Sequence, residues 1–173
     1  MSILQLSISS LLLYLPAMTA NMAPVFAAKY NVITWLNRPL DFGIRLRGIR
    51  VLGSHKTIRG IIVAVFAGAI TGGIEAAVLH QKISFGFFIG AVLGFGAIAG
   101  DAIKSFFKRR LRIVPGSLWI PFDQIDFVIG ATVAGIFFVP ISFPIFLFAI
   151  FFIGCASYVV SYIGIALHFK KSL

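Results

Sequence analysis

Five long apolar runs constrain the fold of this chain more than any other feature of its sequence. Because backbone polar groups in lipid must be bonded within the segment, such runs form helices, and each approaches the roughly 17–25 residues that span a hydrocarbon core. With 60% hydrophobic and only 12% charged residues, the 173-residue chain lacks the polar surface of a soluble domain. The sequence predicts an all-α integral membrane protein, one domain over 1–173, with about five transmembrane helices and two polar loops. The runs lie near residues 2–27, 60–80, 84–100, 124–140 and 145–168.

The first apolar run admits two interpretations. Residues 17–20, Ala-Met-Thr-Ala, weakly match the cleavage site of a secretory signal. A signal peptide also carries positive charge before its apolar stretch, whereas no Lys or Arg precedes Lys29 here. We therefore expect the run to be retained as a transmembrane helix.

The basic residues are distributed unevenly about the apolar runs. An odd number of crossings places the polar stretches 28–59 and 101–122 on the same side as the C-terminus. Seven basic residues lie in the first stretch, five in the second and two in the tail at Lys170 and Lys171, while Lys82 lies opposite. The positive-inside bias assigns the basic side to the cytoplasm of a multi-pass protein of the cell membrane. The formal charge of +10 favours membrane lipids and nucleotide phosphates as partners, and the hydropathy argues against nucleic acid.

Glycines recur along one face of the third run. Residues 86, 90 and 94 are glycines four apart, and glycines follow at 96 and 100. Small residues at this spacing let a neighbouring helix approach closely. We expect these glycines to serve helix packing rather than catalysis.

Three of the five acidic residues gather near one membrane surface. Asp101 closes the third run, while Asp123 and Asp126 open the fourth at a spacing that places both carboxylates on one helix face. One interpretation is local: Asp123 caps the helix and Asp126 complements its dipole. The other is functional, because an ionisable group below the headgroups is costly unless it is paired or metal-bound. Carboxylates suit Mg²⁺, so the three aspartates are the predicted metal ligands.

A basic segment, residues 104–112, lies between these acids. Basic segments beside a membrane often only fix topology and contact anionic lipid. Here the cations alternate with acids, which resembles a site for a Mg²⁺–polyphosphate complex with phosphate oxygens on Lys and Arg. We therefore expect phosphate contacts from Lys104, Lys108 and Arg109. A lipid-facing role is expected for three arginines of the first polar stretch, Arg45, Arg47 and Arg50.

The first polar stretch ends in Gly53-Ser54-His55-Lys56-Thr57-Ile58-Arg59-Gly60. Its Gly-x-x-Lys-Thr order vaguely resembles a phosphate-binding loop, but the glycine spacing of a Walker A motif is absent and no strand precedes it. Two interpretations remain open. The segment is either an anion site formed by a lysine, a hydroxyl and a helix N-terminus, or a plain loop that enters the membrane.

In their order along the chain, these motifs resemble those of archaeal CDP-archaeol synthases, membrane cytidylyltransferases related in chemistry to phosphatidate cytidylyltransferases. The wider phosphatidate enzymes share a Ser-x-x-Lys-Arg element and an Asp-x-x-Asp ending, matched here by Ser105, Lys108, Arg109 and the two later aspartates. Their Lys-Asp pair and His-Gly-Gly are absent, and Gln124 replaces an Arg, which favours the archaeal branch. The matching motifs are Pro39-Leu40-Asp41-Phe42-Gly43, the segments 52–60 and 100–110, Pro115-Gly116 and Asp123-Gln124-Ile125-Asp126-Phe127.

The resemblance implies transfer of CMP from CTP to an isoprenoid ether-lipid phosphate, 2,3-di-O-geranylgeranylglyceryl phosphate, giving CDP-archaeol and pyrophosphate. It implies catalytic roles for Asp101, Asp123, Asp126 and Lys108, with Mg²⁺ on the aspartates. Glycine-lined seams between helices would leave a side opening for the isoprenoid chains. Contacts to the nucleotide are implied for Lys56, Thr57, Arg59, Lys104, Ser105, Arg109 and Gln124.

The hydropathy does not exclude a second class of function. A small non-catalytic transporter or a lipid-binding membrane protein would use the same basic face for anionic lipid. The converging aspartates distinguish the two classes, because a patch that binds anionic headgroups would avoid carboxylates.

Overall fold

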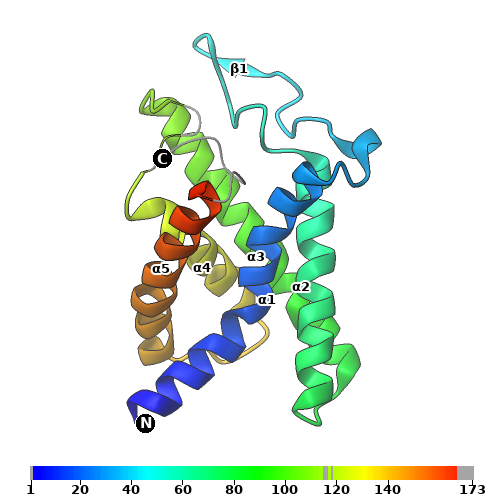
Figure 1. Ribbon diagram of the computed structural model, residues 1–173, viewed down its shortest axis with the longest axis vertical. Coiled ribbons are helices and arrows are strands. Elements are labelled where there is room, and N and C mark those ends of the chain that lie inside the picture. Colours follow the sequence, from blue (N-terminus) through cyan, green and yellow to red (C-terminus); the bar gives the residue numbers. More distant parts are fainter. Residues whose placement is uncertain (1, 115–116, 118, 167–173) are drawn as a thin grey trace.

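The computed structural model describes residues 2–114, 117 and 119–166, and within them five α-helices form one bundle (Figure 1). A 3₁₀ turn η1 and a two-stranded antiparallel hairpin β1–β2 lie in the first polar stretch, at one end of the bundle. The elements are α1 (Ile3–Lys29), η1 (Thr34–Leu36), β1 (Arg45–Leu46), β2 (Ile49–Arg50), α2 (Ile58–Val78), α3 (Ile83–Arg110), α4 (Phe122–Gly135) and α5 (Phe143–Ala166).

The helices confirm the all-α prediction, but two of their boundaries differ from it. The predicted loop 101–122 is wrong in its first half, because α3 continues as a helix to Arg110. Helix α4 ends at Gly135 rather than near residue 140 and has 14 residues. The end of the fifth run at 167–168, the motif Pro115-Gly116 and the basic tail at 170–171 lie outside the described residues.

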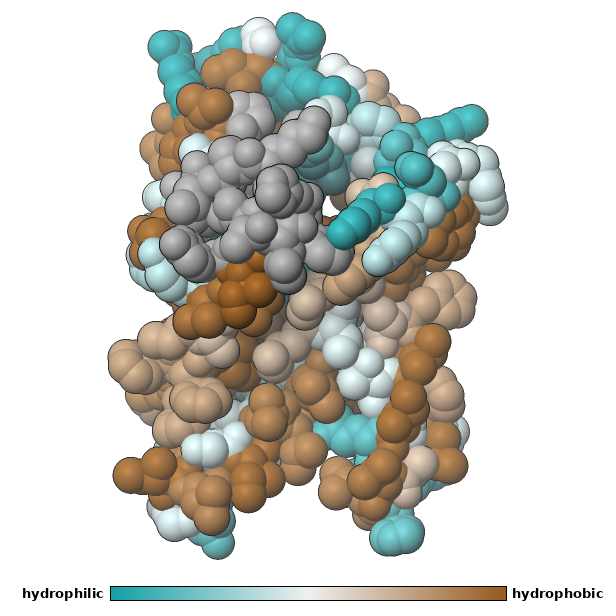
Figure 2. All heavy atoms as spheres, in the orientation of Figure 1, coloured by the Kyte–Doolittle hydropathy of each residue, from teal (hydrophilic) through white to brown (hydrophobic). Residues whose placement is uncertain are grey.

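Four helices, α1, α2, α3 and α5, are long and apolar enough within the described residues to cross a membrane. Large apolar side chains point outward from them, with Phe66 65% and Phe151 75% exposed. Such exposure is costly in water but favourable in lipid. Figure 2 shows a broad hydrophobic band across the middle of the molecule and hydrophilic residues gathered at the end that carries the loops. These features are those of a multi-pass membrane protein.

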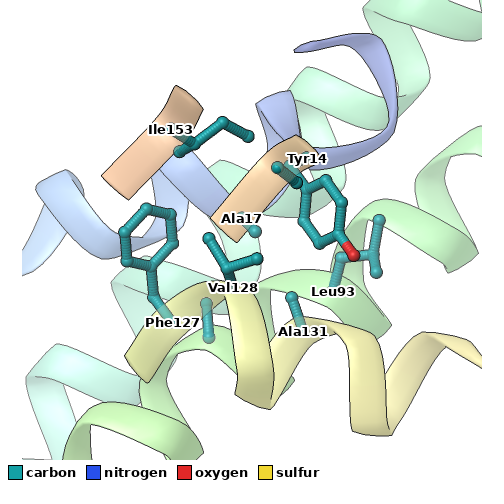
Figure 3. Packing of buried hydrophobic residues seen from close by; sticks show 9 residues of the cluster. Tyr14, Ala17, Leu93, Phe127, Val128, Ala131 and Ile153 are labelled. Atoms are coloured by element: carbon teal, nitrogen blue, oxygen red, sulfur yellow. The ribbon is translucent and has the colours of Figure 1, made fainter. Parts of the chain in front are cut away.

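The core lies where α1, α3, α4 and α5 meet (Figure 3). Tyr14 of α1 is fully buried there among small and branched residues such as Ala17, Leu93 and Val128. Its hydroxyl and that of Thr132 on α4 lie 2.6 Å apart, so the phenol is satisfied within an apolar environment. This contact ties α1 to α4 and fixes one wall of the bundle.

Glycine seams bring α3 into backbone contact with α2 and with α4. A Cβ on Gly68 of α2 would lie 2.5 Å from the carbonyl oxygen of Gly90, and a Cβ on Gly96 would lie 2.5 Å from that of Gly130 on α4. The predicted packing role of these glycines is confirmed. The expected side opening along the seams is wrong, because the partner helix fills the space that the missing side chains leave.

Replacing Gly96 with Ala is expected to destabilise the bundle, because the new methyl group would meet the rigid backbone of α4. Overpacking of this kind typically costs about 1–3 kcal/mol and lowers the Tm of a chain this size by several degrees. The measurement is thermal unfolding in detergent. Gly154→Ala is the matched control, because among the described residues its Cβ would meet only a side-chain methyl group of Ile125, at 3.2 Å, and no backbone. Equal Tm values for the two variants would contradict the close packing of α3 against the α4 backbone at Gly96.

Candidate functional site

Three carboxylates from two helices converge on the ammonium group of Lys104. The Nζ atom lies 3.2 Å from Asp101 Oδ1, 2.7 Å from Asp123 Oδ1 and 2.7 Å from Asp126 Oδ2. The Lys104 side chain is only 13% exposed, so this charge is largely removed from water. The structure therefore brings together the three aspartates that the sequence singled out, around a cation of the chain itself.

The seam between α3 and α4 places these side chains at one depth. Gly100 precedes Asp101 on α3, and its missing side chain admits the α4 backbone at Asp126 and Gly130. Lys104 follows Asp101 by one helical turn, which puts both on the face turned toward α4. Close contact of the two backbones is what allows one ammonium to reach carboxylates on both helices.

Two further lysines neutralise the same carboxylates. The Lys108 ammonium lies 3.2 and 2.9 Å from the two oxygens of Asp123 and also donates to the carbonyl of Ser117 at 2.6 Å. From the first polar stretch, Lys56 pairs with Asp101. Three ammonium groups thus face three carboxylates in one cluster. Buried charges are tolerated when they are paired in this way.

Asp123 does not cap α4 with its side chain, although the sequence left that possibility open. The N-cap is Pro121, and Asp123 Oδ2 instead accepts the backbone N–H of Trp119 at 2.6 Å. Asp126 Oδ1 accepts the N–H of Phe127 at 2.8 Å, while its buried Oδ2 lies 2.7 Å from the Lys104 ammonium and has no other partner in the part of the chain that the structure describes. Both aspartates therefore direct an oxygen toward Lys104 instead of serving only the helix end.

The donor atoms of this cluster fit Mg²⁺ chemically. Carboxylate oxygens are the ligands that this ion prefers, and the Lys104 ammonium, 2.7 Å away, is the one partner of Asp126 Oδ2 within the described residues. Among the described residues, however, no group of three acidic, His or Cys side chains is arranged as a metal site. Lys104 stands where the carboxylates meet, so a metal ion and this ammonium would compete for the same oxygens.

The other residues predicted to contact the nucleotide are more dispersed. Thr57 caps α2 by accepting the N–H of Gly60, and the Ser105 hydroxyl donates to the Asp101 carbonyl within α3. Arg59 is buried and donates to the carbonyl of Val32. Arg109 donates to the carbonyl of Ile113, but its buried Nε–H has no partner among the described residues. Gln124 is buried, and neither polar atom of its amide group has a partner within that same part of the chain.

Asp41 is a buried residue whose role could not be assigned from the sequence. Its carboxylate lies 2.7 Å from the Arg50 guanidinium and accepts three backbone N–H bonds, from Gly43, Leu52 and Gly53. Burial alone would raise the pKa of Asp41, but these hydrogen bonds outweigh it and lower the pKa to about 2.

The expectation that Arg50 faces lipid is wrong, because its guanidinium pairs with Asp41 inside the loop. The Asp-x-Gly spacing, typical of an Asx turn, could have indicated this role.

Comparisons with known proteins agree with this architecture. A family model described as CarS-like, CDP-archaeol synthase, matches residues 3–172. The CDP-archaeol synthase of Methanopyrus kandleri is 48% identical over 95 residues, which are 54% of this chain and 54% of that protein. That of Thermofilum pendens is 38% identical over 129 residues, 72% of this chain and 59% of that protein. The chain therefore aligns with less than two thirds of the length of these two relatives.

Longer alignments and a solved structure extend the similarity. The CDP-archaeol synthase of Sulfurisphaera tokodaii is 37% identical over 134 residues, 78% of this chain and 75% of that protein. A solved intramembrane enzyme for archaeal membrane lipid biosynthesis superposes with a TM-score of 0.74 at 30% identity, covering 91% of this chain and 92% of that one. The match across nearly the whole sequence, together with this shared fold, shows that the chain belongs to the CDP-archaeol synthase family.

Proposed function

We propose that this chain transfers CMP from CTP to an isoprenoid ether-lipid phosphate, 2,3-di-O-geranylgeranylglyceryl phosphate, yielding CDP-archaeol and pyrophosphate. Membership of the CDP-archaeol synthase family supports the reaction and both substrates. The observation that carries the proposal is the cluster around Lys104, which gathers cations and oxygen ligands where the apolar helices meet the polar loops. A protein that only bound anionic lipid would gain nothing from carboxylates there, since they repel the headgroups.

The reaction joins an oxygen of the lipid phosphate to the α-phosphorus of CTP and breaks the bond from that phosphorus to the β-phosphate. The lipid supplies the nucleophile, so no nucleophilic side chain is required. Negative charge moves onto the leaving pyrophosphate, and fixed cations stabilise it. Lys56 and Lys108 supply two ammonium groups that carboxylates already hold in place, so these two side chains need little reorganisation when phosphates arrive.

Mg²⁺ is part of this proposal. Asp101, Asp123 and Asp126 would hold the ion, which when bound would neutralise charge on the phosphate oxygens. Lys104 would then turn from the carboxylates toward a phosphate. This exchange keeps each buried charge paired before and after binding, which avoids the cost of an isolated charge.

The other residues predicted to contact the nucleotide are supported by the structure to different degrees, and their contacts remain predictions. Arg109 and Gln124 carry buried polar atoms that have no partner within the described residues, and a bound nucleotide would supply partners. Thr57, Arg59 and Ser105 already make hydrogen bonds inside the protein. Their contacts to the nucleotide would require these bonds to be shared or exchanged.

The test is a reaction of the purified protein in lipid nanodiscs with CTP, Mg²⁺ and the ether-lipid phosphate. Pyrophosphate and the CMP-bearing lipid should form in equal amounts, and chelation of the metal with EDTA should stop both. Parallel reactions with ATP, GTP and UTP determine the preferred base. Pyrophosphate without a lipid product would indicate a hydrolase instead, and no lipid product with any nucleotide would refute the proposal.

We also propose that the site faces the cytoplasm. In the structure the polar stretch that contains Lys56 and the C-terminal end of α3 lie at one end of the bundle, and Lys82 lies in the turn at the other (Figure 1). The positive-inside bias assigns the more basic end to the cytoplasm. This orientation would expose the site to cytosolic CTP.

Cysteine labelling in intact cells tests this orientation. In a Cys155→Ser background, Ser54→Cys in the exposed first loop should be protected from a membrane-impermeant thiol reagent. Gln81→Cys, in the exposed turn between α2 and α3, is the matched control and should be labelled. Lysis should make both positions react. The reverse pattern in intact cells would place the site on the outer face.

A further inference from the structure

The first polar stretch forms a closed loop, and the point where it closes carries Lys56. The Leu40 N–H donates to the carbonyl of Lys56 at 2.8 Å, and the Ile58 N–H donates to that of Arg38 at 2.9 Å. An antiparallel bridge between Pro39 and Thr57 completes this neck. The Lys56 side chain leaves the neck and pairs with Asp101 on α3. The conformation of the loop therefore determines where this ammonium lies.

Asp41 stands next to the neck and joins the two arms of the loop. Its Oδ1 takes the N–H of Gly43 at 3.1 Å and the Arg50 guanidinium at 2.7 Å. Its Oδ2 takes the N–H groups of Leu52 and Gly53 at 3.2 and 3.1 Å. Asparagine would keep one acceptor oxygen and place an NH₂ group against these donors. A single buried carboxylate thus connects the outgoing arm to the returning arm.

Arg110 fixes the outer part of the loop to α3. Its guanidinium donates to the carbonyls of Leu46, Ile49 and Arg50 at 2.9, 3.2 and 2.9 Å. The same helix carries Asp101, the partner of Lys56. Helix α3 therefore contacts the first loop at two places, at the hairpin through Arg110 and at Lys56 through Asp101. The loop segment between the hairpin and Lys56 is held in its conformation by Asp41.

We propose that Asp41 is a positioning residue, which keeps the Lys56 ammonium against Asp101 by holding the first loop closed. Among the described residues, none of the hydrogen bonds of Asp41 goes to the three aspartates of the site, so its effect passes through Lys56. The proposal depends on the proposed function in one respect only, which is that Lys56 binds a phosphate of the substrate. The placement of the lysine is independent of activity.

Chemical acetylation of the whole protein in nanodiscs tests the placement directly. In Asp41→Asn the rate of Lys56 acetylation, measured by mass spectrometry relative to that of exposed Lys82, should rise by at least about fivefold, because the ion pair between Lys56 and Asp101 is released.

Arg50→Gln removes the charge that pairs with Asp41 and should also raise the Lys56 acetylation rate, which keeps the test valid if one variant folds poorly. Arg47→Gln is the matched control, since the Arg47 side chain makes no hydrogen bond or ion pair within the described residues. Slow modification of Lys104 in every variant would show an intact bundle.

A kinetic cycle separates positioning from general destabilisation. Asp41→Asn should lower kcat/KM for CTP by about tenfold in the wild-type background and by less than about twofold in a Lys56→Met background, because residues that act through one another are non-additive. An unchanged Lys56 acetylation rate in both Asp41→Asn and Arg50→Gln would overturn the proposal. An equal kinetic loss in the Lys56→Met background would also overturn it. If the wild-type chain proves inactive with CTP, the proposed function fails while the acetylation result still decides the placement.

Discussion

Asp123→Asn and Asp126→Asn are each expected to lower kcat by at least about 100-fold, the largest effects we predict for this chain. Asparagine has the size of aspartate, so the helices keep their packing. The charge is lost, however, and Lys104 keeps only two of the three carboxylates that hold it. Any metal ion held there would lose a ligand at the same time.

The double variant provides the sharper observation. If the aspartates act as a unit, Asp123→Asn combined with Asp126→Asn should be hardly slower than either single variant. Steady-state turnover of CTP, with protein amount and Tm measured in parallel, checks this. Glu75→Gln is a matched charge-to-amide control on α2, where Glu75 lines a separate groove of about 240 Å³ with residues such as Leu12 and Leu79. Near-normal rates in both single variants would leave the aspartates with a purely structural role.

Lys108→Ala is expected to lower kcat and kcat/KM for CTP by at least about tenfold, which corresponds to ~1.4 kcal/mol of transition-state stabilisation. Lys108 contacts both oxygens of Asp123 and is buried, so neither salt nor water replaces it. We expect a similar loss for Arg109→Ala, because the buried Nε–H of Arg109 has no partner within the described residues.

Exposed arginines of the first loop provide the contrast for Lys108. Arg45→Ala and Arg47→Ala should change turnover little, and their effect should resemble that of raised ionic strength, since exposed charges are screened within about 8–10 Å. The measurement is steady-state kinetics at saturating lipid over a range of CTP and salt concentrations. If either arginine variant lost as much activity as Lys108→Ala at high salt, the cationic side chains that bind the nucleotide would come from both polar loops.

The number and position of the helices followed from the sequence because lipid permits few alternatives to a helix. The end of α3 did not, since hydropathy marks where the apolar residues stop rather than where the helix stops. Residues 101–110 contain no Gly or Pro, and their charges are satisfied by partners outside the helix, so the helix continues past Asp101. The predicted loop boundary was wrong for this reason.

The candidate site was predictable in part. The spacing of Asp123 and Asp126 on one helix face, opposite Asp101, indicated that the carboxylates would meet. The central position of Lys104 depends on how closely α3 approaches α4, which is set by Gly100 and Gly130 across the seam. The role of Asp41 depends on a fold of the first loop that involves residues nine to twelve positions away. No periodic pattern in the sequence describes such contacts.

Helix α4 has a consequence for the bilayer around the site. Fourteen residues rise about 21 Å, whereas the hydrocarbon core is about 30 Å thick. Its outward side chains, including Ile129 and Val133, are exposed and require lipid contact. Local thinning of the membrane is one of the ways in which a helix shorter than the hydrocarbon core is accommodated. Beside α4 the headgroup layer would therefore dip toward Asp123 and Asp126, and a lipid phosphate would reach the carboxylates by lateral diffusion, with its isoprenoid chains still in the hydrocarbon.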